Sequence, residues 1–285
     1  MTYLITGVTG GLGNGVLKAL SKTVSHDEIA VLVRSEAKGV PFAEAGYAVR
    51  IGDYSDKESL VKAFSGIKTL MFVSGAPGQA VSREVQHKHV IEAAKAAGIA
   101  NLVYTSLANA EGSHSVLAPD HIATEAMIKQ SGLRYKILRN NWYLENELGI
   151  FQDALAGKGF VYAGGEGKVG WALKREYAEA AAQALVQSFD DNHIYELSGP
   201  RLSYADLHQA LETATGKTID AVSMTISDYR AALVSAGLPD EVVGIVTAIQ
   251  SDISAGELDV TSTDFETLLG HALTPVTEAI SELLA

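Results

Sequence analysis

Short apolar segments alternate with longer amphipathic segments along the first half of the chain. Residues 29–33 read IAVLV and are apolar throughout, which is typical of a strand that helices cover on both faces of a parallel sheet. Residues 11–21 instead place Leu12, Val16 and Leu20 on one helical face. This alternation predicts strands over residues 3–6, 29–33, 47–51, 69–73, 101–105 and 135–138, and helices over residues 11–21, 56–64, 84–97 and 120–130.

Strands and helices that alternate at this spacing predict an α/β fold, a Rossmann-type doubly wound parallel sheet with helices on both faces. Ligands of such sheets bind at the carboxyl ends of the strands, near the point where the strand order reverses. The residues that follow each strand are therefore the candidates for a binding site.

The second half of the chain has a different pattern. Residues 157–170 are rich in glycine and predict loops or short strands, and residues 176–187 predict an alanine-rich helix. Residues 194–197 predict a late strand that rejoins the sheet, and further helices start near Ser203, Ser227 and Pro275. We predict a dinucleotide-binding domain over residues 1–155, with the late strand near residues 194–198, and a smaller, mostly helical lobe over residues 156–285 that is interleaved with it.

Composition narrows the classes of function. The chain has no cysteine, so disulfides, thiolate nucleophiles and cysteine metal sites are excluded, and we predict no metal site. Its net charge of −12 disfavours binding to the phosphate backbone of nucleic acids. The first residues enter a strand directly and the apolar segments are short, so we expect a cytoplasmic protein without membrane contact. The oligomeric state stays open, with a homodimer among the alternatives.

A glycine-rich turn follows the first predicted strand and opens the first predicted helix. Gly7, Gly10 and Gly13 stand at G-x-x-G-x-x-G spacing. A pyrophosphate site needs a sharp turn, close backbone approach and helical N–H groups aimed at the phosphate, and each of these favours a residue without a Cβ atom. A plain glycine turn is the weaker alternative. The predicted cofactor turn comprises Gly7, Thr9, Gly10, Gly11, Leu12 and Gly13.

The residues at the end of the second strand favour NADP(H) over NAD(H). An acidic residue there would bind the ribose hydroxyls, but the chain has Arg34 followed by Lys38. The planar guanidinium of Arg34 suits a 2′-phosphate, and Lys38 adds a second positive charge. A solvated arginine on a loop is the alternative.

Small and polar residues end the next three strands. Asp53 and Tyr54 are predicted to contact the cofactor, with Asp53 at the adenine amino group; the alternative for Asp53 is a cap of the following helix. The turn Ser74-Gly75-Ala76-Pro77 is expected to admit the nicotinamide ribose, with Ala76 near the substrate. Thr105 and Ser106 end the fifth strand; they are predicted to line the cofactor, or simply to satisfy backbone groups.

With these residues in place, the chain resembles the NmrA-like, atypical short-chain dehydrogenases over essentially its whole length. The resemblance rests on segments spread through the chain, of which LRNNWYLEN is the most specific. They are residues 2–14 (TYLITGVTGGLGN), 31–38 (VLVRSEAK), 52–56 (GDYSD), 89–107, 120–132, 138–146 (LRNNWYLEN), 195–199 (YELSG) and 234–239 (VSAGLP). The resemblance implies an NADPH-dependent reductase of quinones or similar planar electrophiles.

The chain lacks the Tyr-x-x-x-Lys pair of typical short-chain dehydrogenases. The positions of that tyrosine and lysine fall on Leu117 and His121. Interconversion of alcohols and ketones by the tyrosine mechanism is therefore disfavoured. The quinone reductases that the chain resembles share this loss, and quinone reduction asks mainly for orientation and exclusion of water.

The remaining site predictions follow from the resemblance and from the position of the sixth strand. Asn141, Trp142 and Tyr143 are expected to contact the substrate, and Tyr143 and His121 are candidates for catalytic proton transfer. His121 is also predicted to touch the cofactor. The alternative for Trp142 and Tyr143 is that they are core residues, and the alternative for His121 is that it has only a structural role. A non-enzymatic NADP(H)-binding redox sensor that regulates a transcription factor is the competing function, and a sugar-nucleotide epimerase is a weaker one.

Overall fold

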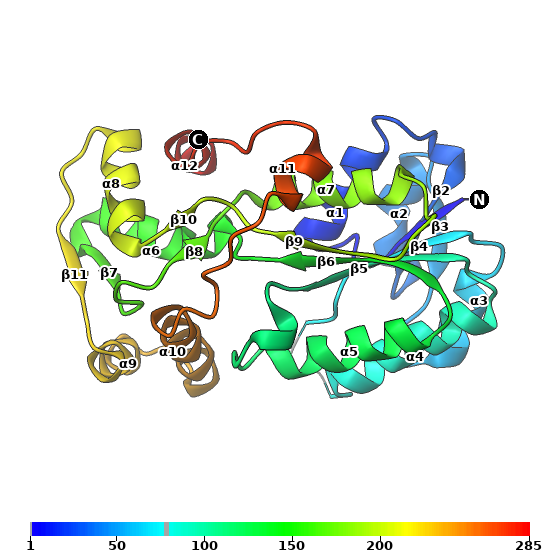
Figure 1. Cartoon of the computed structure of the whole chain (residues 1–285), viewed down its shortest axis with the longest axis horizontal. Coiled ribbons are helices and arrows are strands. Elements are labelled where there is room, and N and C mark those ends of the chain that lie inside the picture. Colours follow the sequence, from blue (N-terminus) through cyan, green and yellow to red (C-terminus); the bar gives the residue numbers. More distant parts are fainter. Residues whose placement is uncertain (1, 77–79) are drawn as a thin grey trace. The chain divides into compact units, whose positions relative to one another are not determined.

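The computed structural model describes residues 2–76 and 80–285, which form two compact units (Figure 1). Unit 1 comprises Met1–Leu107, Asp120–Arg139 and Lys174–Tyr195. Unit 2 comprises Ala108–Pro119, Asn140–Leu173 and Glu196–Ala285. Within the described residues, no helix is long and apolar enough to cross a membrane.

A seven-stranded sheet forms the centre of unit 1. Its spatial order is β3-β2-β1-β4-β5-β6-β9, and the pairs around β1, β2 and β4 are parallel and in register. The strands are β1 (Tyr3–Ile5), β2 (Ile29–Val33), β3 (Ala48–Ile51), β4 (Thr69–Phe72), β5 (Asn101–Leu107), β6 (Arg134–Asn140) and β9 (His193–Leu197). The late strand does rejoin the sheet, beside β6. The predicted Rossmann-type fold is confirmed, and its strand order reverses between β1 and β4.

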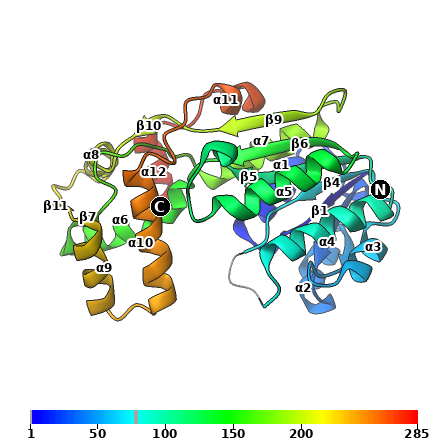
Figure 2. The same ribbon diagram turned by 60° about the horizontal axis from the view of Figure 1, so that its bottom comes forward.

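Helices cover both faces of this sheet (Figure 2). The helices of unit 1 are α1 (Gly11–Leu20), α2 (Glu36–Glu44), α3 (Lys57–Phe64), α4 (Arg83–Ala96), α5 (Ala118–Gln130) and α7 (Lys174–Val186). α1 and α7 lie on one face, and α3, α4 and α5 lie on the other. Every residue of β2 is buried, as its apolar sequence predicts.

Two local features qualify the sequence predictions. Helix α2 was not predicted, because Gly39 and Pro41 lower helix propensity within this short segment. The N-cap of α3 is Asp56 rather than Asp53, since the Asp56 carboxylate accepts hydrogen bonds from the N–H groups of Glu58 and Ser59.

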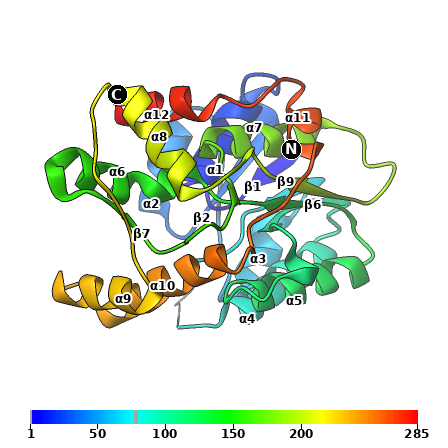
Figure 3. The ribbon, with the colours of Figure 1, turned by 60° about the vertical axis from the view of Figure 1, so that its left-hand side comes forward.

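Unit 2 is mostly helical, with short strands in and after the glycine-rich segment. Its elements are α6 (Leu148–Asp153), β7 (Phe160–Tyr162), β8 (Val169–Gly170), β10 (Arg201–Leu202), α8 (Tyr204–Thr215), β11 (Ala221–Ser223), α9 (Ile226–Ser235), α10 (Asp240–Ser254), α11 (Asp264–Leu269) and α12 (Val276–Leu284). β8 pairs with β10 and β7 pairs with β11. α9 and α10 pack side by side (Figure 3). A separate apolar core is formed by residues of α6, β7, β8, α8, α10 and α12, with others from the loops between them.

The division into units differs from the predicted boundary at residue 155. Helix α7 belongs to unit 1 because it packs on α1, where a Cβ atom on Gly15 would lie 2.8 Å from the Cβ atom of Ala178. Residues 108–119 belong to unit 2 because Ser113 and Ser115 donate hydrogen bonds to Glu257 and Asp252. Long-range packing, which local patterns do not report, sets both assignments.

Candidate cofactor site

The glycine-rich turn between β1 and α1 has the geometry that its sequence predicts. Gly7 has a φ angle of +67°, and the N–H group of Gly10 donates to the Gly7 carbonyl oxygen at 2.9 Å. A Cβ atom on Gly13 would lie 2.3 Å from that same oxygen. Helix α1 therefore starts tight against β1, with its first N–H groups at the strand end.

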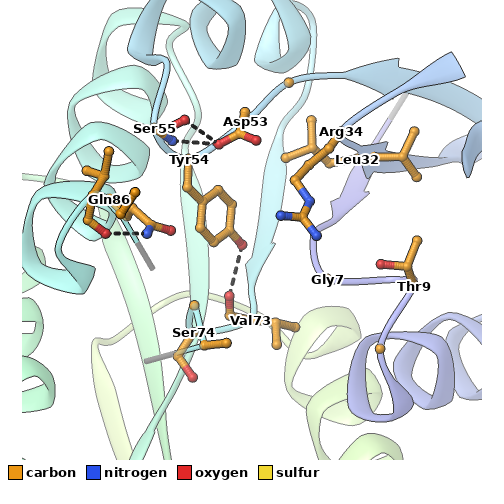
Figure 4. Close-up of a pocket in the computed structure, with 17 residues that line it drawn as sticks. Gly7, Thr9, Leu32, Arg34, Asp53, Tyr54, Ser55, Val73, Ser74 and Gln86 are labelled. Carbon is orange, nitrogen blue, oxygen red and sulfur yellow. Dashed lines mark hydrogen bonds between the residues drawn. The ribbon is translucent and has the colours of Figure 1, made fainter. Parts of the chain in front are cut away.

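A pocket of about 460 Å³ lies at the carboxyl ends of the first four strands (Figure 4). Its walls come from β1 to β4 and the segments that follow them, on either side of the point where the strand order reverses. The lining residues are Gly7, Thr9, Gly10, Leu32, Val33, Arg34, Gly52, Asp53, Tyr54, Ser55, Val73, Ser74, Gly75, Ala76, Ala80, Val81 and Gln86. The structure thus brings together nine of the predicted site residues, from four segments of the sequence.

Arg34 supplies a positive charge to this pocket. Its side chain extends from the end of β2 into the space between Tyr54 and Thr9 (Figure 4). Asp53 lies across from it at the end of β3. Burial raises the pKa of Asp53, but hydrogen bonds from Ser55 and the charge of Arg34 outweigh burial, so the pKa is lowered and the carboxylate stays ionised.

Tyr54 connects three strand ends beneath the pocket. Its hydroxyl lies 2.5 Å from Thr6 Oγ1 and 2.9 Å from the Val73 carbonyl oxygen. The N–H group of Val73 also donates to Thr6 Oγ1, at 2.9 Å. Burial raises the pKa of Tyr54 well above its ordinary value, so the phenol remains a neutral hydrogen-bonding group.

Two side chains hold the segment that follows β4. The N–H group of Ser74 donates to Thr105 Oγ1 at 2.9 Å, and the N–H group of Gly75 donates to His87 Nε2 at 2.9 Å. Thr105 therefore acts on the pocket through Ser74, although it does not line the pocket itself. Pro77, which the sequence places in the same turn, lies outside the described residues.

The position of His87 is fixed from both ring nitrogens. Because Nε2 accepts from Gly75, the proton is on Nδ1, which donates to Thr124 Oγ1 at 2.8 Å. Burial, with a smaller contribution from Arg83, lowers the pKa of His87 to about 3. His87 is neutral at physiological pH, so it remains an acceptor for the Gly75 N–H group.

His121 lies behind the pocket rather than in its lining. The Arg83 guanidinium donates to its Nε2 atom at 2.9 Å, so its Nδ1–H group donates to the Tyr104 hydroxyl at 2.8 Å. Burial, with contributions from Arg83 and His87, lowers its pKa well below the usual range. These contacts are those of the structural alternative, and a role of His121 in cofactor contact or proton transfer stays a prediction.

Other predicted cofactor residues also lie outside the pocket lining. Gly11 and Leu12 are in the first turn of α1, and Lys38 is exposed in the first turn of α2. The Ser106 hydroxyl donates to the buried Glu125 carboxylate at 2.6 Å, and Glu125 pairs with Arg139 at 2.7 Å. Ser106 is therefore part of a buried ionic network.

The predicted substrate residues from the NNWY segment lie in unit 2 and have partners there. The side-chain amide nitrogen of Asn141 donates hydrogen bonds to Ser198 Oγ and to the Leu258 carbonyl oxygen, at 3.0 Å each. The Trp142 indole N–H donates to Glu147, and the Tyr143 hydroxyl accepts from Asn140 at 3.0 Å. Their contact with a substrate stays a prediction. Ala76 lines the pocket in unit 1.

Sequence patterns did not identify three contributors to the site. Gln86 lines the pocket from the first turns of α4, and His87 follows it. Lys174 starts α7, and its Cδ atom lies 3.3 Å from where a Cβ atom on Gly11 would stand. Lys174 thus places a cationic side chain beside the N-terminus of α1. Local sequence gives no signal for it, because the contact joins residues far apart in the chain.

The residues present fit a dinucleotide and show no metal centre. Glycines clear the approach to the α1 N-terminus, and Arg34 provides the charge that a phosphate requires. Among the residues that the structure describes, no group of three or more His, Asp or Glu side chains could hold a metal ion.

Comparison with known proteins agrees with this geometry. A family model described as NAD(P)H-binding matches residues 7–165. Quinone oxidoreductase 2 of Escherichia coli K12 is 38% identical over 280 residues, which cover 98% of this chain and 97% of that protein. NAD(P)H azoreductase of Xenophilus azovorans is 27% identical over 90% of both chains.

Solved structures of two bacterial reductases superpose on the whole chain. The NADPH-dependent quinone oxidoreductase of E. coli complexed with NADPH has a TM-score of 0.94 at 37% identity and covers 100% of both chains. The triphenylmethane reductase of Citrobacter sp. has a TM-score of 0.94 at 35% identity, covering 100% of this chain and 99% of that one. The resemblance inferred from the sequence segments is confirmed.

Proposed function

Because the chain belongs to the NAD(P)H-binding family, we propose that it is an NADPH-dependent oxidoreductase that transfers a hydride to quinones or similar planar electrophiles. One observation carries the choice of cofactor: Arg34 lines the pocket at the end of β2, where a 2′-phosphate would need a cation. The E. coli relative with 38% identity is a quinone oxidoreductase, which supports the choice of substrate.

The side chains of unit 1 bind and orient the dinucleotide. The turn from Gly7 to Gly13 and the N-terminus of α1 hold the pyrophosphate, and Arg34 pairs with the 2′-phosphate. Asp53 accepts from the adenine amino group. Ser74, Gly75 and Ala76, fixed by Thr105 and His87, form the wall against which the nicotinamide ribose lies.

Hydride transfer to a quinone does not require a side-chain acid, because water can supply the proton. NADPH, when bound, would supply a hydride, and with it two electrons, to the quinone, and a proton from solvent would complete the hydroquinone. Trp142 and Tyr143 offer aromatic surfaces, and the substrate role proposed for them is to orient a planar ring.

Replacing Tyr143 by Phe tests whether its hydroxyl transfers a proton. An unchanged kcat with benzoquinone would exclude the hydroxyl as proton donor.

Steady-state and stopped-flow absorbance at the NADPH band test the proposal directly. We expect the wild-type protein to oxidise NADPH with a small quinone. Arg34→Ala should raise the KM for NADPH by roughly tenfold or more, because a charge-assisted contact is lost, and should leave the KM for NADH unchanged. Lys62→Ala is the matched control, since it removes an exposed cation that lies outside the pocket.

Two results would overturn parts of the proposal. Equal losses for NADPH and NADH in Arg34→Ala would remove Arg34 from the recognition of the 2′-phosphate. Tight binding of NADPH without turnover across a panel of quinones would exclude the reductase and favour the non-enzymatic redox sensor.

A further inference from the structure

A second cavity, of about 710 Å³, lies entirely within unit 2. It is bounded by α6, β7, α9 and α10, and shares no residue with the dinucleotide pocket. Most of its wall is apolar, with contributions from Ile150, Val161, Met224, Leu233, Val246 and Ile249. A cavity of this size and lining is large enough for a small organic molecule.

One buried carboxylate interrupts this apolar wall. Glu147 is only 3% exposed, yet it lines the cavity. Its Oε1 atom accepts hydrogen bonds from the indole N–H groups of Trp142 at 3.0 Å and Trp171 at 3.2 Å. The Tyr204 hydroxyl lies 3.3 Å from Oε1 and 3.2 Å from Oε2. Oε2 therefore has fewer partners than Oε1 and retains room for another donor.

The charge of Glu147 has donors but no cation to balance it. Among the described residues, burial and the hydrogen bonds from Trp171, Tyr204 and Trp142 account for the pKa shift of Glu147, with no contribution from a lysine or arginine charge. Lys158, which also lines the cavity, pairs with Asp153 at 2.7 Å. A buried carboxylate that is not paired carries a large desolvation cost.

A purely structural role would not need this charge. Gln250 donates to the Tyr204 hydroxyl at 2.6 Å, so neutral groups already continue the network around Glu147. A glutamine at position 147 would accept from the same indoles without burying a charge. We propose that the cavity in unit 2 binds an organic cation, an arylalkylamine whose apolar ring lies on the aliphatic wall and whose ammonium group contacts Glu147 Oε2. This proposal goes beyond the proposed reductase activity, with which the cavity shares one residue, Trp142.

Protonation of Glu147 should control this binding. Burial raises its pKa to about 7, despite the hydrogen bonds from Trp171, Tyr204 and Trp142. The other titratable groups that face the cavity are Tyr204, Tyr229, Asp153 and Lys158. Burial and the Glu147 charge raise the pKa of both tyrosines, which stay neutral. An ammonium ligand should therefore bind more tightly at pH 8 than at pH 6.

Calorimetric titration with 1-naphthylmethylamine, without any dinucleotide, tests the proposal. We expect binding to the wild-type protein at pH 8 that weakens by roughly tenfold at pH 6 and by a similar factor in Glu147→Gln at pH 8, because an ion pair is lost. The uncharged 1-naphthylmethanol should bind weakly and without pH dependence to both proteins.

A second pair of variants keeps the test decisive if Glu147→Gln fails to fold. Ala232 lines the cavity from α9, and its neighbour Ala231 does not; both are exposed. Ala232→Trp should fill the cavity and abolish amine binding, whereas Ala231→Trp should leave it intact. No binding to the wild-type protein, equal binding of amine and alcohol, or equal binding to both tryptophan variants would overturn the proposal. Because no dinucleotide is present, failure here is separate from failure of quinone reduction.

Discussion

The Nε2 atom of His87 accepts a hydrogen bond from the backbone N–H group of Gly75 at 2.9 Å. His87 lies in α4 and Gly75 follows β4, so one buried imidazole fixes the wall of the dinucleotide pocket from behind. We expect His87→Leu to raise the KM for NADPH severalfold, with a smaller change in kcat, because the Gly75 N–H group is left without a partner.

The same substitution should lower the free energy of unfolding by about 1–3 kcal/mol, the cost of an unsatisfied buried donor. Chemical denaturation and NADPH kinetics measure the two effects. Lys88→Leu, on an exposed position of the same helix, is the control. If His87→Leu binds NADPH as the wild type does, His87 does not position the pocket wall.

Lys174 and Arg34 should contact different phosphates of the dinucleotide. Lys174 lies beside Gly11 at the α1 N-terminus, where the pyrophosphate common to both dinucleotides is expected. Lys174→Met should therefore raise the KM for NADPH and for NADH by similar factors, roughly fivefold to tenfold, whereas Arg34→Ala affects NADPH alone. Lys22→Met, which removes an exposed cation, is the control. A loss confined to NADPH would place Lys174 at the 2′-phosphate instead.

Gly13 should tolerate no side chain. A Cβ atom there would lie 2.3 Å from the Gly7 carbonyl oxygen and 2.9 Å from that of Thr6, so α1 would have to move away from β1. We expect Gly13→Ala to lower the free energy of unfolding by about 3 kcal/mol or more and to abolish dinucleotide binding. Gly244, in the interior of α10, has no atom within 4 Å of its Cβ position, so Gly244→Ala should stabilise the protein by about 0.5–1 kcal/mol. Thermal unfolding measures both effects. A Gly13→Ala variant as stable as the wild type, or a Gly244→Ala variant less stable than the wild type, would contradict the prediction.

Glu147 should make stability depend on pH. Its folded-state pKa of about 7 is above the ordinary value of 4.5, so the folded state holds a proton that the unfolded state has lost. Its contribution is therefore fully present below pH 4.5 and is lost as the pH rises through 7. Between pH 4.5 and pH 7, the free energy of unfolding of the wild-type protein should fall by roughly 3 kcal/mol relative to that of Glu147→Gln. Urea denaturation from pH 5 to pH 8 measures this difference. If the free energy of unfolding has the same pH dependence in both proteins, the pKa of Glu147 is not raised.

The sequence by itself determined the parts that depend on neighbouring residues. The apolar run 29–33 predicted a strand buried at every position, and the glycines from Gly7 to Gly13 predicted the turn at the α1 N-terminus. The position of Arg34 directly after that strand placed it in the pocket. These features follow from periodicity, backbone freedom and strand ends, which a local pattern specifies.

Only the tertiary structure decided which distant residues support the site. Tyr54 meets Thr6 across 48 positions of the chain, and Lys174 reaches Gly11 across more than half of its length. The structure also gave the buried His121 two partners, Arg83 and Tyr104, and placed Glu147 and Tyr204 in the wall of one cavity. Such contacts depend on how helices pack on the sheet and on each other, and the local sequence around a residue does not report which distant partner that residue meets.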